Sequence, residues 1–208
     1  MMEFDFVKNG LAAEGFEFSD EQIKQWTHYL KGIQLWNKAY NLTSIVEPEE
    51  MLVKHLFDSI VLIPYLKKVK HGRMIDVGTG AGLPGFILAI AMPETHFVLL
   101  DTNSKRTRFM NQMKMELGMK NVEIVHSRVQ DYQPDELFDV ILSRAFASAE
   151  DMVTWSKHLL IDGGCFAAMK GHVTPGEWQF AEEGYRSEII SLSVPRLNDA
   201  RHLVFLSC

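Results

Sequence analysis

The sequence predicts an α/β fold in which a mostly parallel, seven-stranded sheet follows an N-terminal helical cap. After residue 70, short apolar runs alternate with segments of helical periodicity, a pattern typical of a parallel sheet. Only the turn-forming residues 195–200 separate the last two runs, which predicts an antiparallel hairpin at the C-terminus. We therefore expect a helical cap over residues 1–70 and a sheet domain over residues 71–208, packed as one compact unit.

The cap contains two helix starts. Ser19 and Gln22 form a capping box, in which the two side chains satisfy free backbone N–H groups. An apolar stripe at helical spacing follows it, and we expect this stripe to pack against the sheet domain: Ile23, Trp26, Leu30, Ile33 and Trp36. Residues 36–43 break that period, and Pro48 begins a second helix. This second helix carries Met51, His55, Asp58 and Ser59.

Beyond residue 70 the pattern predicts each strand and helix in turn. We expect strands at Arg73–Val77, His96–Leu100, Val122–His126, Phe138–Ser143, Gly164–Met169, Tyr185–Val194 and His202–Ser207. We expect helices at Leu83–Ala91, Ser104–Leu117, Ala149–Leu160 and Pro175–Glu183. Five strand–helix units followed by two strands indicate a sheet that is parallel except for its C-terminal hairpin.

Composition and charge limit the function classes. No apolar run in the 208 residues reaches the roughly 18 needed to span a membrane. Cys165 and Cys208 are the only cysteines and form no Cys-x-x-Cys motif, so we expect neither a disulfide framework nor a metal site. We expect a monomeric, cytoplasmic protein. The net charge is −6, yet residues 51–128 carry 11 basic and 6 acidic side chains. This basic region suits a polyanionic partner, although solvated helix faces explain it equally well.

The glycine-rich loop after the first predicted strand is the most informative segment. Residues 76–85 read Asp-Val-Gly-Thr-Gly-Ala-Gly-Leu-Pro-Gly, and Asp101 follows the next predicted strand. Glycines let the backbone approach a ligand, and a helix start offers unpaired N–H groups. The loop fits the dinucleotide pattern G-x-G-x-x-G, because Asp101 lies 21 residues after Gly80. It also fits the loop of S-adenosylmethionine (AdoMet) methyltransferases, in which Gly78 and Gly80 approach the cofactor.

An acid before the first glycine favours AdoMet, because the carboxylate of Asp76 can bind the cationic amino group of AdoMet. The same carboxylate would lie unhelpfully near a dinucleotide pyrophosphate. The seven-stranded plan also matches AdoMet methyltransferases, whereas a dehydrogenase would need further residues for a catalytic domain. A glycine-rich turn without a ligand is the structural alternative for the whole loop. For Asp76 alone, the alternative is a cap on the loop backbone.

Two more charged residues are candidates for this site. Asp101 is expected to bind the ribose hydroxyls of the cofactor, and its alternative role is to cap the helix that begins at Ser104. Arg144 follows the fourth predicted strand, in the crevice where doubly wound sheets bind ligands. It is our candidate catalytic side chain, able to pair with the AdoMet carboxylate or to hold guanine O6 or a phosphate. The structural alternative is an ion pair with an acid such as Asp139.

Polar and basic residues elsewhere are candidates for RNA contacts: Asn37, Lys38, Tyr40, Asn41, Lys105, Arg106 and Arg128. The asparagines can equally satisfy backbone groups at a helix–loop junction, and the basic side chains can simply be solvated. His55 is expected to be a core histidine bonded to Asp58 or to the backbone.

Six blocks together resemble the bacterial small-subunit rRNA methyltransferase G family, also called glucose-inhibited division protein B. They are Trp36–Ser44, His55–Ser59, Asp76–Gly85, Ser127–Val129, Ser143–Ala147 and Arg201–Val204. The similarity runs from about residue 20 to the C-terminus. It implies AdoMet-dependent methylation of guanine N7 at one position in the decoding-region loop of 16S rRNA, within the small ribosomal subunit. The cofactor contacts that it implies are Gly78, Leu83, Val129, Gln130 and Arg144.

The chain departs from the family pattern at two positions. Ala81 stands where proline is common, and Gln130 stands where an acid occurs in relatives. A backbone contact from residue 130 to adenine would survive this change, whereas a side-chain role would not.

The residues after the fourth strand agree with N7 chemistry. Ser143-Arg-Ala-Phe146 replaces the Asn/Asp-Pro-Pro-aromatic turn of amino-group methyltransferases, and both cysteines lie in apolar contexts unlike those of a carbon methyltransferase nucleophile. Guanine N7 is already nucleophilic, so alignment alone can supply roughly 7–11 kcal/mol. Two other function classes stay open: a small nicotinamide-dependent oxidoreductase, and an RNA-binding protein that holds AdoMet without turnover.

Overall fold

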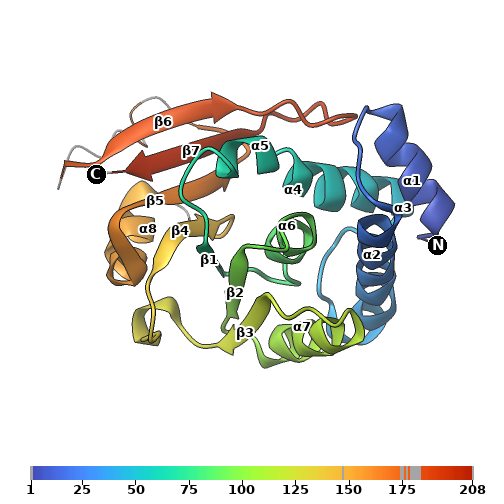
Figure 1. Ribbon diagram of the computed structural model, residues 1–208, viewed down its shortest axis with the longest axis horizontal. Helices are drawn as coiled ribbons and strands as arrows, with labels where there is room; N and C mark the ends of the chain where they lie inside the picture. The colour runs from blue at the N-terminus through green and yellow to red at the C-terminus, as the bar shows by residue number, and fades with distance from the viewer. Residues whose placement is uncertain (1, 147, 174–175, 177, 179–183, 208) are drawn as a thin grey trace.

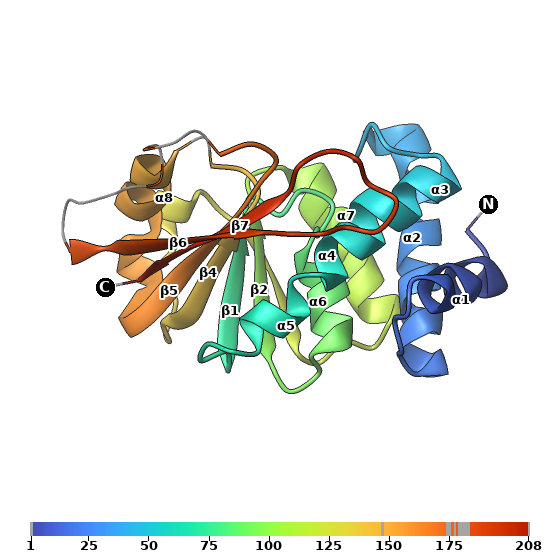
Figure 2. The ribbon, with the colours of Figure 1, turned by 90° about the horizontal axis from the view of Figure 1, so that it is seen from above.

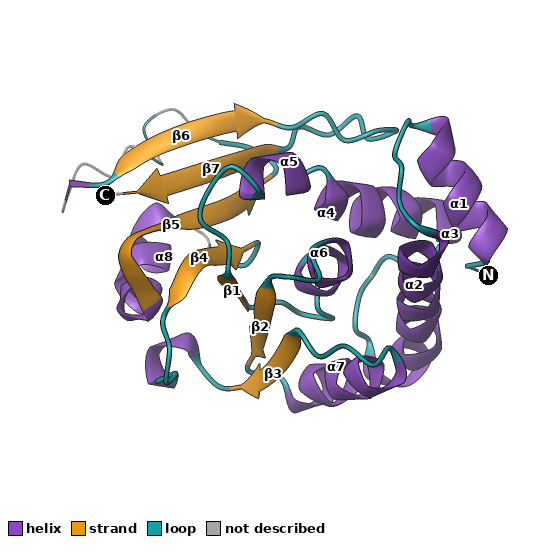
Figure 3. Ribbon diagram, viewed as in Figure 1, coloured by secondary structure: helices purple, strands orange, loops and turns teal. Residues whose placement is uncertain are grey.

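The computed structural model describes residues 2–146, 148–173, 176, 178 and 184–207, and its centre is a single sheet of seven strands (Figures 1 and 3). The strand order is β3-β2-β1-β4-β5-β7-β6. The strands are β1 Arg73–Val77, β2 His96–Asp101, β3 Val122–His126, β4 Phe138–Ser143, β5 Leu160–Lys170, β6 Arg186–Ser191 and β7 His202–Ser207. β1 to β5 pair in parallel, and β7 is antiparallel to both β5 and β6. The predicted fold class is confirmed.

The helices are α1 Phe4–Ala13, α2 Asp20–Tyr40, α3 Pro48–Met51, α4 Asp58–Ile60, α5 Ile63–Leu66, α6 Gly85–Ala91, α7 Ser104–Glu116 and α8 Ala149–Ser156. A π-helical turn, Leu52–Phe57, joins α3 to α4, and 3-10 turns lie at Val129–Asp131 and Lys157–Leu159. The helix expected from Pro48 is therefore confirmed at its start but has π geometry in its middle. The helix expected at Pro175–Glu183 lies largely outside the described residues.

The capping box predicted for α2 is present, since the Ser19 hydroxyl accepts from the Gln22 backbone and the Gln22 side chain accepts from the Ser19 N–H. The helix continues beyond the expected break at residue 36. Trp36 stacks on Tyr40, with ring centroids 5.2 Å apart, and this contact favours one more helical turn. Asn41 then ends the helix in the left-handed conformation, with φ 50°.

The sheet is covered by helices on both faces, with α6 and α7 on one and α8 on the other (Figure 1). Successive residues of β1 illustrate the alternation: Met74 packs among the side chains of α2, α6 and α7, and Ile75 packs with those of α8. The apolar stripe of α2 packs on α6, where the indole N–H of Trp26 donates to the carbonyl of Ile87 at 3.1 Å. Helices of the cap and one face of the sheet therefore share a hydrophobic core. The domain boundary at residue 70 stays a prediction.

The connection between β6 and β7 crosses the molecule and passes over α3 and α4 (Figure 2). Arg196 in this connection pairs with Glu14 at 2.6 Å and lies 3.6 Å from the carboxylate of Glu49. The C-terminal hairpin is thus held against the N-terminal helices. No described helix is both long and apolar enough to cross a membrane.

Candidate functional site

The glycine-rich loop joins β1 to α6 and is organised around the buried carboxylate of Asp76. Oδ2 of Asp76 accepts hydrogen bonds from the Thr79 hydroxyl at 2.6 Å and from the Gly85 N–H at 2.9 Å. Burial raises the pKa of Asp76 to about 7. Its second oxygen, Oδ1, is buried and has no hydrogen-bond partner among the described residues. One oxygen therefore caps the loop, as in the structural alternative, and none of the described residues donates to the other.

Two glycines of this loop are required for different reasons. A Cβ on Gly85 would come within 2.1 Å of Leu99 and 2.9 Å of Oδ2 of Asp76, so glycine lets the start of α6 pack on the sheet. Gly78 has φ +68°, and its Cβ would come within 2.6 Å of the Cβ of Ala145. Glycine at position 78 therefore keeps the loop close to the segment that follows β4.

Asp101 ends β2 and lies against the glycine loop. Its Oδ2 accepts from the Gly80 N–H at 2.8 Å, and its Oδ1 accepts from the Asn103 N–H at 2.8 Å. Nη1 of Arg106 lies 3.4 Å from Oδ2. The N-cap of α7 is Asn103, whose side chain accepts from Lys105 and Arg106, so the alternative role of Asp101 as the cap of that helix is wrong. Asp101 instead links the loop to the start of α7.

A cleft of about 290 Å³ opens at the carboxyl ends of β1, β2 and β4. It is lined by Val77, Gly78, Leu100, Asp101, Thr102, Arg106, Arg128, Val129, Gln130, Ala145, Phe146 and Trp155. Phe146 and Trp155 form an edge-to-face pair, with ring centroids 6.0 Å apart, on one wall. Apolar walls suit a purine ring, and a carboxylate at a strand end suits ribose hydroxyls.

The structure brings four of the predicted cofactor-binding residues to this cleft: Gly78, Asp101, Val129 and Gln130. Asp76, Gly80 and Leu83 do not line the cleft. Asp76 and Gly80 instead fix the conformation of the loop beside the cleft. Asp76 accepts from Thr79 and Gly85, and the N–H of Gly80 donates to Asp101. The cleft fits AdoMet in the close approach of the loop at Gly78. The unpartnered Oδ1 of Asp76 is buried and is not part of the cleft lining, so its contact with AdoMet stays a prediction.

The comparisons with known proteins decide the family. The family model of rRNA small subunit methyltransferase G matches residues 22–204. The chain is 47% identical to Ribosomal RNA small subunit methyltransferase G of Shewanella piezotolerans, over 98% of this chain and 97% of that protein. It is 51% identical to the protein of the same name from Psychromonas ingrahamii, over 90% of each chain. This chain belongs to the rRNA small subunit methyltransferase G family.

Solved structures show the same fold at low identity. Precorrin-6y C5,15-methyltransferase of Geobacter metallireducens has a TM-score of 0.56 and 14% identity, over 82% of this chain and 92% of that one. A SAM-dependent methyltransferase of Aquifex aeolicus also has a TM-score of 0.56, with 17% identity, over 78% and 94%. These likenesses show the shared fold. AdoMet, the cofactor expected from the glycine loop, is the cofactor of the methyltransferase G family to which the chain belongs.

Arg144 of this methyltransferase G family member lies outside the cleft. It lines a second cavity of about 260 Å³ together with Asp58, Met169, Lys170, Gly171 and Arg201. Its Nη2 lies 3.7 Å from Oδ2 of Asp58. The expected alternative partner, Asp139, binds Lys70 at 2.9 Å and the Arg73 N–H at 2.8 Å instead. An ion pair is present, but the expected partner is wrong, and a contact from Arg144 to the cofactor stays a prediction.

The residues expected to contact RNA lie in different parts of the structure. Arg106 and Arg128 line the cleft. Nζ of Lys105, near the start of α7, lies 6.0 Å from the ring centroid of Tyr40, the last residue of α2. Asn37 and Asn41 have structural roles, because the Asn37 side chain accepts from the Thr43 N–H at 2.9 Å and Asn41 caps α2. RNA contact by these residues stays a prediction.

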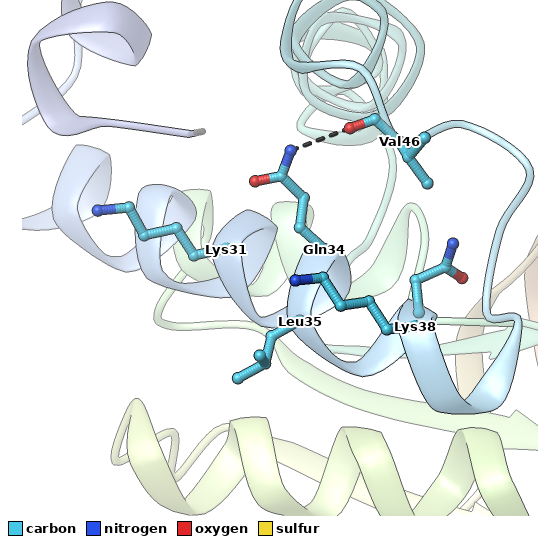
Figure 4. A pocket seen from close by; sticks show the side chains of 6 residues that line it. Lys31, Gln34, Leu35, Lys38 and Val46 are labelled. Atoms are coloured by element: carbon cyan, nitrogen blue, oxygen red, sulfur yellow. Dashed lines mark hydrogen bonds between the residues drawn. The ribbon is translucent and has the colours of Figure 1, made fainter.

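Lys38 lies in a different place, a groove of about 640 Å³ on α2 (Figure 4). Lys31, Gln34, Leu35, Asn37, Lys38 and Val46 line this groove. Gln34 closes one side by donating to the carbonyl of Val46 at 2.9 Å. None of these residues lines the cleft, so Lys38 and the cleft belong to separate surface features.

The other titratable candidates are buried. The ring of His55 is buried, as expected, and burial lowers its pKa to about 4, but neither ring nitrogen has a well-formed hydrogen bond to Asp58 or to another described residue. Burial raises the pKa of the Cys165 thiol to about 11, so it is not a thiolate nucleophile. Cys208 lies outside the described residues. Within the described part of the chain, no group of His, Cys, Asp and Glu side chains has the arrangement of a metal site.

The sequence did not single out Asp58, Arg201 or Trp155 as site residues. Asp58 and Arg201 lie in blocks that carried the family resemblance, and that was the available signal. Trp155 lies in no motif, and only the packing of α8 against the strand ends brings it to the cleft.

Proposed function

We propose that this protein transfers the methyl group of AdoMet to guanine N7 at one position in the decoding-region loop of 16S rRNA. The observation that carries the proposal is the cleft, where the glycine loop, Asp101 and the Val129–Gln130 turn meet at the carboxyl edge of the sheet. Membership in the methyltransferase G family supports small-subunit rRNA as the substrate.

Four residues hold the cofactor in this proposal. Asp101 accepts from the ribose hydroxyls, and the backbone of Val129 and Gln130 meets the adenine edge. Oδ1 of Asp76, which the chain leaves without a partner, accepts from the amino group. Bound AdoMet supplies an electrophilic methyl group on a sulfonium ion.

The remaining task of the protein is alignment. The lone pair of guanine N7 forms the new bond to carbon, the carbon–sulfur bond breaks, and its electron pair stays on sulfur. The positive charge moves from the sulfonium to the purine, and no proton has to leave first. This chemistry agrees with a cleft whose one lining carboxylate, Asp101, already accepts from the N–H groups of Gly80 and Asn103, and positioning alone supplies roughly 7–11 kcal/mol.

We further propose that the enzyme works as a monomer in the cytoplasm, on small subunits rather than on protein-free rRNA. The basic region near the cleft is modest, with Arg106 and Arg128 among its lining residues. Ribosomal proteins would then present the loop. Equal methylation of protein-free rRNA and subunits would contradict this part.

The test is methyl transfer from labelled AdoMet into small subunits that lack their N7-methylguanine, followed by mapping of the modified nucleotide. One N7-methylguanine in the decoding-region loop is the expected result. Label elsewhere would overturn the substrate, and no label despite AdoMet binding would favour an RNA-binding protein without turnover. Tighter binding of NAD than of AdoMet in a calorimetric titration would favour an oxidoreductase.

A further inference from the structure

Two arginines face one carboxylate in the second cavity, at Arg144. Arg144, Arg201 and Asp58 line it, together with Lys170, which donates to the carbonyl of Phe146. They come from elements far apart in the sequence: the ends of β4 and β5, the residue before β7, and the start of α4. The sheet register places the ends of β4 and β5 and the start of β7 at the edge that carries the glycine loop.

Asp58 joins the two arginines. Its side chain is 1% exposed, Oδ1 accepts from Nε of Arg201 at 3.1 Å, and Oδ2 faces Nη2 of Arg144 at 3.7 Å. Arg201 also donates to the carbonyl of Ala200 at 2.9 Å. The hydrogen bonds to Asp58 and to Ala200 orient Arg201, and the longer ion pair draws Arg144 toward Asp58. Each guanidinium carries five N–H donors, so these contacts use only part of them. Burial raises the pKa of Asp58, and the two arginines oppose this effect.

The cavity and the cleft share a wall. Arg144 lines the cavity, while the next two residues, Ala145 and Phe146, line the cleft. The Ser143 hydroxyl fixes this segment, since it donates to the carbonyl of Val77 at 2.8 Å and accepts from the Ala145 N–H at 3.0 Å. A nucleotide whose base meets the cofactor in the cleft therefore has its backbone within reach of the cavity.

The chemistry of the reaction decides which part of a nucleotide these arginines hold. An arginine that reads guanine usually binds O6 and N7 together, and such a contact would occupy the lone pair that must attack the methyl group. A phosphate has no such conflict, and its oxygens match the planar fork of a guanidinium.

We propose that this cavity is a phosphate subsite for the RNA backbone beside the target guanosine, and that Asp58 is the positioning residue that holds Arg144 and Arg201 for it. The proposal rests on the RNA methyltransferase activity proposed above. A buried ion pair in general contributes little to the free energy of unfolding. Stability alone therefore does not account for two arginines around the carboxylate of Asp58, whereas an anionic ligand does.

The test compares Asp58→Asn, Arg201→Ala and Arg201→Lys with wild type in binding to unmethylated small subunits across a range of salt concentrations. Asp58→Asn adds one positive charge to the cavity, so a loose cationic patch would bind RNA more tightly after this change. The subsite requires the opposite, about tenfold weaker binding, because the guanidiniums lose their anchor. Arg201→Ala should lower the slope of log affinity against log salt by about 1, the value of one phosphate contact.

Arg201→Lys keeps the charge but loses the fork, so it should weaken binding and raise KM for subunits while leaving the salt slope unchanged. Arg196→Ala is the matched control, because Arg196 lies in the same β6–β7 connection and pairs with Glu14 away from the cavity. It should leave subunit binding and its salt slope unchanged. AdoMet affinity, measured by calorimetry, and the unfolding temperature show which variants are folded. If Asp58→Asn does not fold, the two Arg201 variants decide the test, because Arg201 is partly exposed and its substitution should leave the fold intact.

Unchanged subunit affinity and salt slope in folded Arg201→Ala would overturn the subsite, as would tighter binding by Asp58→Asn. A selective loss of AdoMet affinity in the Arg201 variants would also overturn it, since the cavity would then hold the cofactor. Absence of methyl transfer by wild-type protein would instead overturn the proposed function, and the binding measurements do not depend on that result.

Discussion

Substitution of two neighbouring glycines by alanine separates the conformational role of the loop from its close approach to the cleft. Gly78 and Gly80 have nearly equal left-handed conformations, with φ +68° and +66°. A Cβ on Gly80 would meet no atom within 4 Å, whereas a Cβ on Gly78 would come within 2.6 Å of the Cβ of Ala145. Gly80→Ala is therefore the matched control for Gly78→Ala.

The expected magnitudes follow from these contacts. A left-handed conformation costs an L-residue about 1–2 kcal/mol, and this cost applies to both variants. Two carbon atoms pack best about 3.5–4.0 Å apart, so Ala145 must move by about 1 Å in Gly78→Ala. Such overpacking adds about 1–3 kcal/mol. We expect unfolding free energies lowered by about 2–5 kcal/mol for Gly78→Ala and about 1–2 kcal/mol for Gly80→Ala.

The same displacement should alter cofactor binding, because Ala145 lines the cleft. We expect AdoMet affinity to fall at least about tenfold in Gly78→Ala, which corresponds to 1.4 kcal/mol, and to change much less in Gly80→Ala. Urea unfolding followed by tryptophan fluorescence measures the stabilities, and calorimetric titration measures the affinities. Equal losses of stability and of affinity in the two variants would refute the reasoning from the Ala145 contact.

Three further predictions concern Asp76 and Cys165. If Asp76 binds the amino group of AdoMet as proposed, its pKa of about 7 means that AdoMet affinity should rise between pH 6 and 8 as the carboxylate forms. Asp76→Asn should then bind AdoMet weakly and without this rise, which calorimetry at three pH values measures. The raised pKa means that the folded protein keeps a proton that the unfolded chain releases above pH 3.8. The stability of wild type relative to Asp76→Asn should therefore fall by up to about 1.4 kcal/mol per pH unit between pH 4 and 7, and a difference independent of pH in urea unfolding would argue against a neutral buried carboxyl. Cys165→Ser should keep methyl transfer within about twofold, because a buried thiol with a pKa of about 11 supplies no nucleophile at neutral pH; loss of transfer in folded protein would point to carbon methylation.

The centre of the sheet was predictable because β1, β2 and β4 are buried on both faces and read as short apolar runs. The glycine loop was predictable for a similar reason, since close approach and left-handed φ leave few residues other than glycine. For Asp76, the alternative role as a cap on the loop backbone is confirmed, because Oδ2 accepts from Thr79 and Gly85. The contact of Asp76 with the amino group of AdoMet stays a prediction, for which the unpartnered Oδ1 is available.

Contacts between distant segments were not predictable from local patterns. The alternative to a functional role for Arg144 was an ion pair with an acid such as Asp139, which is close to it in sequence, but the two lie near opposite ends of β4. The acid that does meet Arg144 is Asp58, 86 residues earlier, because the chain enters α4 beside the end of β4. Likewise, the stacking of Trp36 on Tyr40 extends α2 past the point at which its apolar period ends.

The N-terminal helices complete the site as well as covering the core. Tyr29 of α2 donates to the carbonyl of Ala81 at 2.7 Å, which fixes the glycine loop from the cap side. Asp58 of α4 holds Arg144 and Arg201, and Arg196 ties the β6–β7 connection to Glu14 of the segment after α1. A sheet domain that begins at residue 71 would lack Tyr29 and Asp58, and its loop and both arginines would lose their anchors. In the proposed function, the cap is therefore part of the machinery that positions cofactor and RNA, and the division at residue 70 would separate segments of the chain rather than separate functions.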